Sequence, residues 1–417
     1  MATTPLSQLI HRHRPDTKPL EDLYKHLHQH PELSNQESET AATIVARLEA
    51  IAPADLIIKS GIGGHGIAAT LRNSDGPVVL LRADIDALPV EERTGLAYAS
   101  TKRMVHAPTG VEKPVMHACG HDMHIVCLLG AAEALFSSRK HWSGTLVLVF
   151  QPAEERGTGA QAMVDDGLYS THGVPIPDIV LGVTSGPCEP AQSAHAGALS
   201  LPARTAFESR FTARVPTQAC HILSRETDPA ESSVVTVATV HAGDAENVIP
   251  DTAVLGIDTR STTVAARERI MNRIQTIIHA ESSCAGAPKV PEFEQTRSFP
   301  LTINDEAVTQ QIEQAFAGHF GEGPGQFNKS MPRLSFSEDF AILATSVGKP
   351  YCFFTYGCVD EELWDRAERE GSISQTVAAN HSSKFAPVIM PTLKVGMDGY
   401  TLGALSFLVS ATTRAAS

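Results

Sequence analysis

The sequence lacks the features that mark membrane, nucleic-acid-binding and secreted proteins. No uninterrupted apolar run approaches the roughly 20 residues that a membrane-spanning helix needs. Positive charge is in deficit, since 33 Lys and Arg stand against 47 Asp and Glu, and the formal net charge of -14 argues against a nucleic-acid surface. The beginning of the chain has neither the basic nor the apolar segment of a secretion signal. We therefore expect no membrane and no nucleic acid among its partners.

Cysteine is also scarce. Seven cysteines at irregular spacing do not form a disulfide framework. Together with the missing secretion signal, this predicts a reducing, cytoplasmic location, in which a thiol is available as a metal ligand.

The chain has 417 residues, more than one hydrophobic core usually serves, and its 42% hydrophobic and 19% charged residues are typical of globular proteins. Two domains are therefore expected.

A cluster of thiol, imidazole and carboxylate groups occupies residues 116–124, Met-His-Ala-Cys-Gly-His-Asp-Met-His. Cys119 and His121 are two residues apart, so on a helix they would point about 200° apart and could converge on one ion only from a turn. Gly120 supplies the freedom for that turn. The apolar run 125–136 suits a buried helix, whose N-terminus favours a thiolate. These ligands suit zinc or another late divalent ion better than magnesium, and a helix start with incidental histidines is the alternative.

Three apolar segments are predicted to be buried strands that alternate with helices. Asp84 and Asp86 follow the first strand, and Glu154 and Glu155 follow the second. This alternation predicts an α/β sheet with helices on both faces, in which ligands bind beyond the carboxyl ends of the strands. The expected strands are residues 77–81, 145–150 and 178–183, and the expected helices are two within 19–50, separated by Pro31, and one at 125–136. The first helix and its end carry His26, His28 and His30, which we expect to be mostly surface or structural histidines.

The pattern changes between residues 201 and 300. Strand-like and helical segments follow one another in the order β-α-β-β-α, with a last strand near Phe293, which is the order of a ferredoxin-like domain. The α/β pattern then resumes with a helix at 305–320, a strand at 351–354 and a final helix at 392–409. We therefore predict a discontinuous α/β domain with a mixed central sheet at residues 1–200 and 301–417, interrupted by a smaller α+β domain at 201–300.

The adjacent pair Glu154 and Glu155 follows one of the predicted buried strands. Because adjacent side chains diverge, one carboxylate can bind a cation while the other stays free as a general base. Metal-assisted hydrolysis requires this division of roles. Adjacent glutamates are also common on protein surfaces, which is the alternative for this pair.

Six segments carry a family resemblance. They are Arg-Ala-Asp-Ile-Asp-Ala-Leu-Pro at 82–89, Met-His-Ala-Cys-Gly-His-Asp at 116–122, Phe-Gln-Pro-Ala-Glu-Glu at 150–155, Ala-Glu-Asn-Val-Ile-Pro at 245–250, Ser-Glu-Asp-Phe at 337–340, and Asn-His at 380–381 with Phe-Ala-Pro at 385–387. Together they resemble the M20 metallopeptidase family, and most closely its amidohydrolase branch, which includes N-acyl-amino-acid, hippurate and auxin-conjugate hydrolases. The likeness covers nearly the whole chain, in order.

The resemblance implies an amidase with one or two divalent ions, zinc or manganese, a catalytic domain, and an inserted lid domain through which the chain would form a homodimer. By position in the family, the metal ligands would be Cys119, His121, Glu155 and His381. Glu154 would be the general base that activates a metal-bound water, and Asn247 in the lid would help to bind the substrate. Asp84 and Asp86 would orient the ligands from outside the metal's own coordination sphere.

Thr184 departs from the family pattern. In this branch a histidine that ligates metal follows the strand at 178–183, and here that place holds Thr184. A neutral hydroxyl is a poor substitute for imidazole on a late divalent ion. His172 and His195 are nearby, but neither stands at the equivalent place. The resemblance therefore leaves the second metal position open.

The predicted lid departs from the family as well. The family has a Gly-Gly-His-Gly-like segment after the first lid strand, whose histidine reaches the substrate. The only such string here, residues 63–66, falls in the other domain, and the stretch 211–225 is too short to hold the usual loop and helix. Loss of a donor to the developing oxyanion costs on the order of a hundredfold or more in rate.

Two functions follow from these observations. The first is metal-dependent hydrolysis of the amide bond of an N-acyl amino acid or small peptide, with Glu154 as the base. The second is that of a diverged relative, with an incomplete metal site and weak or no hydrolysis, that acts in binding or in another acyl transfer.

Overall fold

The computed structural model describes residues 5–52, 54–186, 194–195, 200–201, 203–209, 222–228, 232–242, 247, 252–322, 326–329 and 337–409. The chain forms two compact units. The first consists of Met1–Leu199, Asn304–Pro332 and Ile342–Ser417, so it is discontinuous in sequence. The second consists of Ser200–Ile303 and Arg333–Ala341.

The first unit is built on a seven-stranded mixed sheet of order β1-β2-β6-β3-β7-β15-β8. Its strands are β1 (Leu56–Ile62), β2 (Gly66–Arg72), β3 (Val78–Asp84), β6 (Thr145–Gln151), β7 (Ile179–Gly186), β8 (Ala194–His195) and β15 (Tyr351–Gly357). The strands β6, β3, β7 and β15 are parallel, whereas β1, β2 and β8 pair antiparallel with their neighbours. The predicted mixed α/β sheet is thereby confirmed, and the predicted strands correspond to β3, β6, β7 and β15.

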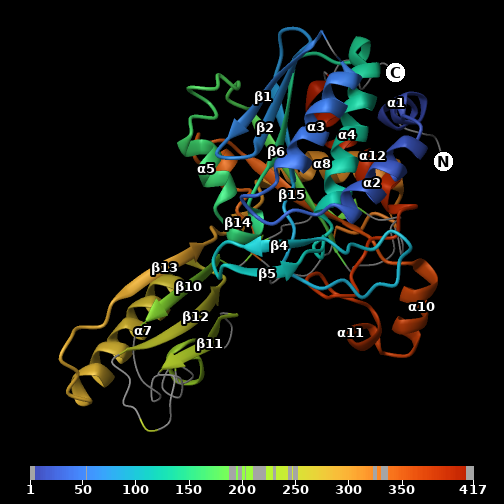
Figure 1. Ribbon diagram of the computed structural model, residues 1–417. Helices are drawn as coiled ribbons and strands as arrows, with labels where there is room; N and C mark the ends of the chain where they lie inside the picture. Colours follow the sequence, from blue (N-terminus) through green and yellow to red (C-terminus); the bar gives the residue numbers. More distant parts are fainter. Residues whose placement is uncertain are drawn as a thin grey trace. The chain divides into compact units, whose positions relative to one another are not determined.

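Helices cover both faces of this sheet. Figure 1 shows α3 and α4 on one side of it and α5 on the other. The helices are α1 (Pro5–His13), α2 (Lys18–Gln29), α3 (Ser38–Ile51), α4 (His121–Ser137), α5 (Gly159–Asp165), α8 (Glu306–Phe320), α9 (Ile342–Thr345), α10 (Glu361–Arg369), α11 (Ile373–Thr376) and α12 (Thr392–Leu408). α4 is buried along almost its whole length, because it packs on β3 and is enclosed by α2, α3 and α12. This explains the apolar run that follows the cysteine and histidine cluster.

The side chains at the end of β7 point alternately to the two faces of the sheet, because neighbouring residues of a strand point to opposite faces. Val183 belongs to the apolar core that β7 shares with α4 and α12. Ser185 points the same way, since its Oγ lies 3.0 Å from Nε2 of His124 in α4. Thr184 therefore faces away from α4.

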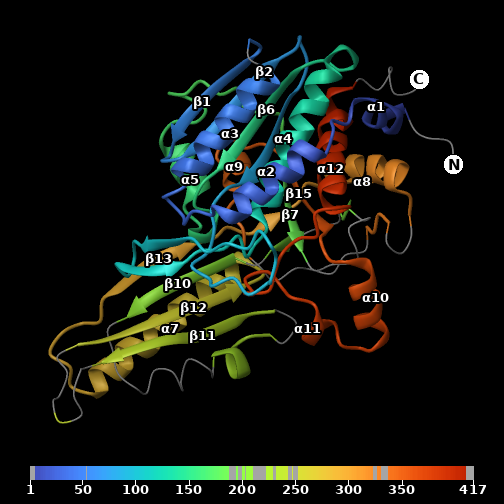
Figure 2. The same cartoon turned by 45° about the vertical axis from the view of Figure 1, so that its right-hand side comes forward.

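The second unit contains a four-stranded antiparallel sheet of order β11-β12-β10-β13. Its elements are β10 (Ala203–Ser209), η3 (Ile222–Glu226), β11 (Val234–Ala242), β12 (Ala253–Ser261), α7 (Val264–Cys284) and β13 (Phe293–Ser298). Numbered along the chain, the four strands have the order 2-3-1-4, which is that of a ferredoxin-like sheet. Figure 2 shows α7 lying along this sheet, and Ile270, Ile274 and Ile278 of α7 form a buried core with Leu255 and Ile257. The predicted roles of this unit as lid and dimer interface stay predictions, and residues 210–221, where part of the first helix was expected, lie outside the described chain.

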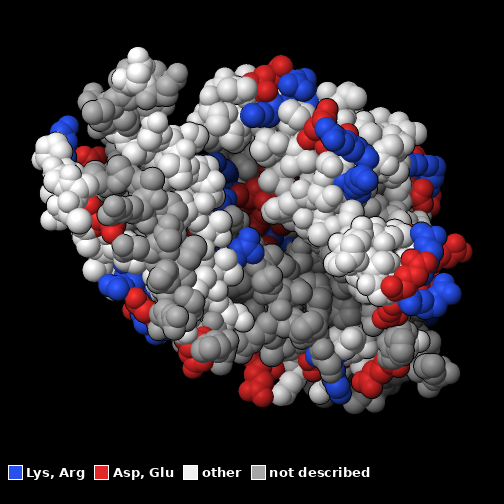
Figure 3. All heavy atoms as spheres, turned by 90° about the horizontal axis from the view of Figure 1, so that it is seen from below, with Lys and Arg blue, Asp and Glu red and all other residues white. Residues whose placement is uncertain are grey.

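Short elements complete the structure. The strands β4 (Arg103–His106) and β5 (Val111–Pro114) form a hairpin, and β9 (Ser200–Leu201) pairs with β14 (Thr302–Ile303). The 3-10 helices η1 (Arg139–His141) and η2 (Glu154–Arg156) follow α4 and β6. In the described part of the chain no helix is long and apolar enough to cross a bilayer. On the face drawn in Figure 3, basic and acidic side chains are interspersed among uncharged ones over the described residues.

Candidate active site

The turn between Cys119 and His121 has the geometry expected from the sequence. Gly120 has φ of 80°, in the left-handed region that favours glycine, and α4 begins at His121. A Cβ atom at position 120 would lie 2.6 Å from Oγ of Ser185. The predicted turn is confirmed, and it directs two neighbouring side chains toward different groups of partners.

The first group contains Cys119, Glu155 and His381, which offer one ligand atom each within 4.8 Å of one another. Nε2 of His381 lies 3.5 Å from Oε1 of Glu155. His381 has φ of 70°, which is strained for a residue with a side chain, and its N–H donates to the carbonyl of Ala118 at 2.7 Å. The Cys119 thiol and the Glu155 carboxylate raise the pKa of His381 to about 10. Residues far apart in sequence thus present a thiol, a carboxylate and an imidazole to one point.

The second group contains His121, Glu154 and Glu155. Nδ1 of His121 lies 2.8 Å from the backbone carbonyl of Asp86, to which it donates, so Nε2 is the nitrogen that faces the glutamates. Nε2 is 3.9 Å from Oε2 of Glu154 and 3.9 Å from Oε1 of Glu155. Burial acts to lower the pKa of His121, but the charge of Asp84 and the bond to Asp86 raise it well above its usual value. A cation bound at Nε2 would replace that proton.

Asp86 fixes the backbone of the glutamate pair. Its Oδ1 accepts from the N–H of Glu154 at 3.2 Å, and its Oδ2 accepts from the N–H of Glu155 at 3.1 Å. The hydroxyl of Ser34 donates to the same Oδ2 at 2.7 Å. Asp86 therefore holds the backbone of both glutamates, and its orienting role toward a metal site stays a prediction.

Glu37 extends this clamp by one residue, and the sequence reasoning missed it. Its Oε1 accepts from the N–H of Ala153 at 2.9 Å and from the N–H of Asn35 at 2.9 Å. Ala153 has φ of 49°, so the residue before the glutamate pair is also strained. Burial, and then the charge of Asp86, raise the pKa of Glu37 to about 7. An acidic residue before a helix is too common to indicate this role from sequence.

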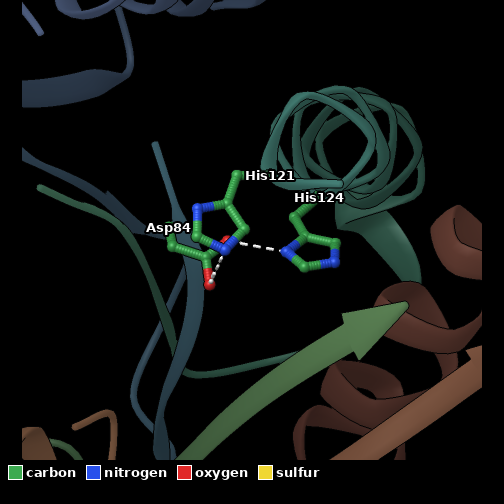
Figure 4. Close-up of side chains that lie close together, drawn as sticks. All are labelled: Asp84, His121 and His124. Carbon is green, nitrogen blue, oxygen red and sulfur yellow. Dashed lines mark hydrogen bonds and ion pairs between the residues drawn. The ribbon is translucent and has the colours of Figure 1, made fainter. Parts of the chain in front are cut away.

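Asp84 lies at the end of β3 between two histidines of α4 (Figure 4). Its Oδ1 is 2.6 Å from Nδ1 of His124, and its Oδ2 is 3.5 Å from Nε2 of His121. Arg82 donates from Nη1 to Oδ2 at 2.9 Å, and the N–H of Ser185 donates to Nε2 of His124 at 2.8 Å. Burial acts to raise the pKa of Asp84, but the positive charges of His121 and Arg82 and the hydrogen bond from His124 hold it far below its usual value. Asp84 is therefore a buried, ionised carboxylate beside the second group.

A third buried cluster supports α4 from behind. His28 is buried, with Nδ1 2.7 Å from Oδ2 of Asp122 and Nε2 3.1 Å from Oε1 of Glu92. Burial acts to lower the pKa of His28, but its two carboxylate partners raise it to about 10. The sequence held one signal for this, since His28 follows buried Leu27 and lies one turn after buried Tyr24 on α2.

Thr184 and His172, which the sequence also singled out, are not brought into these groups, and the structure does not test the places of His195 and Asn247. Thr184 is buried in β7, and its Oγ1 is 3.4 Å from the carbonyl of Ser185. His172 pairs with Asp166 at 3.0 Å. The backbone of His195 lies in β8, and its side chain falls outside the described part. Asn247 is exposed in a turn of the second unit, and its predicted role in substrate binding stays a prediction.

The chemistry of the first group fits a divalent cation. Oε1 of Glu155 is buried without a hydrogen-bond partner among the described residues, although a buried carboxylate oxygen normally has one. Its neighbours are Cys119 and His381, and thiolate, imidazole and carboxylate are the ligands that zinc takes. His121 adds an imidazole on the other side of Glu155. The four predicted ligands therefore fall into two groups that share Glu155, and three of them lie close enough together to hold one cation.

Comparisons with known proteins show the family of the chain. Residues 80–370 match the peptidase family M20/M25/M40. The chain is 34% identical over 358 residues to N-acetyl-L-cysteine deacetylase of Bacillus subtilis, a match that covers 81% of this chain and 80% of that protein. The chain belongs to the M20 family. It lies in the amidohydrolase branch of that family, so the resemblance stated from the six motifs is confirmed.

Two further M20 relatives extend the comparison. IAA-amino acid hydrolase ILR1-like 4 of Arabidopsis thaliana is 32% identical over 347 residues, with 79% of this chain and 75% of that protein covered. The crystal structure of the Bacillus subtilis YXEP protein, a dinuclear metal binding peptidase from the M20 family, superposes with a TM-score of 0.70 at 27% identity, covering 94% of this chain and 98% of that one. The chain is thus a metal-dependent amidohydrolase or peptidase of the M20 family.

Proposed function

We propose that this M20 enzyme hydrolyses the amide bond of an N-acyl amino acid or small peptide. The observation that carries the proposal is the convergence of Cys119, Glu155 and His381 in one group, with His121 and Glu154 directly beside them. The printed names of two relatives support the substrate class, since one is a deacetylase of N-acetyl-L-cysteine and the other hydrolyses IAA-amino acids.

Each group has a separate task in the proposed reaction. Cys119, His121, Glu155 and His381 would hold one or two divalent cations, which would supply polarisation of the scissile carbonyl and acidification of water. Glu154 takes a proton from the attacking water and delivers it to the nitrogen that leaves. Asp86 supports both steps because it holds the backbone N–H groups of Glu154 and Glu155.

A diverged relative that binds ligand without efficient hydrolysis is the second candidate. Thr184 favours it, since the family's ligand at that place is absent. The two candidates differ in turnover: purified protein supplied with zinc, manganese or cobalt should hydrolyse members of an N-acyl amino acid panel if the first is right. Metal-free protein without turnover under all three ions would exclude the first.

The role of Glu154 has its own test. Glu154→Gln keeps the size of the side chain but removes the base, so turnover should fall below detection while metal content stays largely intact. Glu133→Gln is the matched control, because Glu133 lies on α4 and pairs with Arg47, with 39% of its side chain exposed. Turnover that survives in Glu154→Gln would show that another group is the base.

A further inference from the structure

Asn380 precedes His381 in one of the six segments that carry the family resemblance, and the proposed reaction does not use it. Its half-buried side chain belongs to the loop between α11 and α12. The backbone of this loop is fixed beside Cys119, because the N–H of His381 donates to the carbonyl of Ala118 at 2.7 Å. The amide of Asn380 is therefore held against the turn that carries the thiol.

The amide nitrogen of Asn380 contacts three acceptors. Nδ2 lies 3.0 Å from the carbonyl oxygen of Ser185 at the end of β7, 3.3 Å from the carbonyl oxygen of Cys119 and 3.5 Å from Sγ of Cys119. An amide NH2 group has two protons, so one serves Ser185 and the other is shared between the two atoms of Cys119. The two carbonyls also fix which end of the amide faces Cys119, since a flipped group would turn Oδ1 toward them.

The other neighbours of the thiol are of a different kind. A carboxylate oxygen of Glu155 and a ring nitrogen of His381 lie within 4.8 Å of Sγ and of each other, and both can bind a cation together with it. An amide NH2 nitrogen offers no lone pair to a cation. Asn380 therefore contacts Sγ only as a hydrogen-bond donor, from outside the group of ligands.

A hydrogen bond from an amide to a metal-binding thiolate has two consequences. It is charge-assisted, so it is stronger than a bond to a neutral thiol, and it restricts the rotation of the side chain that carries the sulfur. Thiolate selects soft late ions such as zinc and cadmium, whereas manganese prefers oxygen ligands. A residue that acts through Sγ should therefore affect the binding of soft ions more than the binding of manganese.

We propose that Asn380 is a positioning residue, which holds the thiolate of Cys119 toward Glu155 and His381 and thereby sets the preference of the site for a soft divalent cation. This inference rests on the proposed function, since it concerns the same metal site. The alternative is a purely structural amide, which only ties the backbone of Cys119 to the end of β7 through two carbonyls.

Asn73 provides the matched control. It is half-buried like Asn380 and follows β2, and its Nδ2 donates to the carbonyls of Arg139 and Trp142 at 2.7 Å and 2.6 Å. Asn73→Ala and Asn380→Ala thus each remove an amide that joins two backbone carbonyls. Only Asn380→Ala also removes a donor to a thiol.

Calorimetric titration of metal-free protein with cadmium and with manganese tests the inference. Asn380→Ala should bind cadmium about ten- to hundredfold more weakly than the wild type, and manganese less than about threefold more weakly. Asn73→Ala should keep both affinities. Equal losses for the two ions in Asn380→Ala, or no loss for either, would overturn the inference, because the amide would then support the backbone alone.

The absorption spectrum of the cobalt-loaded protein reports on the thiolate directly, because a cobalt–thiolate bond gives a charge-transfer band in the near ultraviolet. Removal of a hydrogen bond raises the energy of the sulfur lone pairs. The band should therefore move to longer wavelength in Asn380→Ala, stay in place in Asn73→Ala and vanish in Cys119→Ser. An unmoved band in Asn380→Ala, or a wild type without the band, would overturn the inference.

A crystal structure of the cadmium-loaded wild type avoids the risk that Asn380→Ala misfolds. Nδ2 of Asn380 should lie within hydrogen-bond distance of the sulfur that binds cadmium, and an amide turned away from that sulfur would refute the inference. Equal behaviour of Asn380→Ala and Asn73→Ala, in a protein whose wild type hydrolyses N-acyl amino acids, would refute the inference alone. A selective loss of cadmium affinity in a protein without any turnover would refute the proposed function alone.

Discussion

Gly120→Ala tests whether the turn between Cys119 and His121, two of the proposed metal ligands, controls the site. Gly95 is the matched control, since its φ of 76° is close to the 80° of Gly120, and a Cβ added at Gly95 would meet nothing within 4 Å. A Cβ at position 120 would lie 2.6 Å from Oγ of Ser185 and 3.3 Å from Cγ of Pro387. The backbone strain is therefore common to both variants, and the steric clash belongs to Gly120 alone.

The magnitudes follow from these contacts. An alanine with positive φ costs about 1–2 kcal/mol, which should be the whole loss in Gly95→Ala. Crowding in a closely packed site adds about 1–3 kcal/mol in Gly120→Ala. Part of that increment is the bond between Oγ of Ser185 and Nε2 of His124, 3.0 Å apart, which is worth about 1 kcal/mol. We expect Gly120→Ala to lose about 2–5 kcal/mol in total and to bind metal about ten- to hundredfold more weakly, because Cys119 and His121 are displaced.

Denaturant unfolding and metal titration of both variants measure these effects. Adding Ser185→Ala removes the clashing oxygen, so the double variant Gly120→Ala/Ser185→Ala should recover about 1 kcal/mol relative to the sum of the single changes. Equal stability and equal metal affinity in Gly120→Ala and Gly95→Ala would refute the reasoning. So would strict additivity with Ser185→Ala, because the clash would then lie elsewhere.

Three further predictions concern buried carboxylates and a buried histidine. Asp86→Asn turns an amide N–H toward a backbone N–H, so the free energy of unfolding should fall by about 2–4 kcal/mol and metal affinity by about ten- to hundredfold. Ser34→Ala, which removes only one donor to Asp86, should cost about 1 kcal/mol. Equal losses of the two variants in denaturant unfolding would contradict this prediction. The pKa of His28 is raised to about 10, so the stability that its protonated form gives the folded state is complete below pH 6.5 and is lost as pH rises toward 10. His28→Gln should therefore flatten the pH dependence of the free energy of unfolding between pH 6.5 and 10. An unchanged slope would show that His28 is not protonated. Asp398→Asn removes the buried partner of Arg14 and His319 and should cost about 3–5 kcal/mol without changing metal content, so metal loss in the folded variant would contradict a purely structural role.

Local features of this protein were readable from sequence because local sterics and periodicity produce them. The apolar segments became β3, β6, β7 and β15 since only buried strands in a two-sided sheet can be apolar on both faces. Pro31 separates α2 from α3 because proline cannot continue a helix. The conformation of Gly120 follows from the need to turn two neighbouring side chains toward different partners.

Residues that act through distant partners were not readable in this way. Glu37 gave no signal, because its partner Ala153 is separated from it by 116 residues. His28 gave only a weak signal. Its spacing from the other apolar residues of α2 fits the buried face of that helix, but its two carboxylate partners come from other segments. A hydrogen bond between distant residues depends on how the strands and helices pack, which no local pattern contains.

The sequence alone determined which candidate ligands this protein has: Cys119, His121, Glu155 and His381 are present, and Thr184 stands where the family resemblance implies a histidine. Only the tertiary structure decided that a buried carboxylate, that of Asp84, faces Nε2 of His121, the nitrogen that also faces the glutamate pair. The physical reason is that ligand identity is a property of single residues. Whether a carboxylate orients a ligand or is available as one depends instead on which ring nitrogen it faces, and that is set by the packing of β3 against α4.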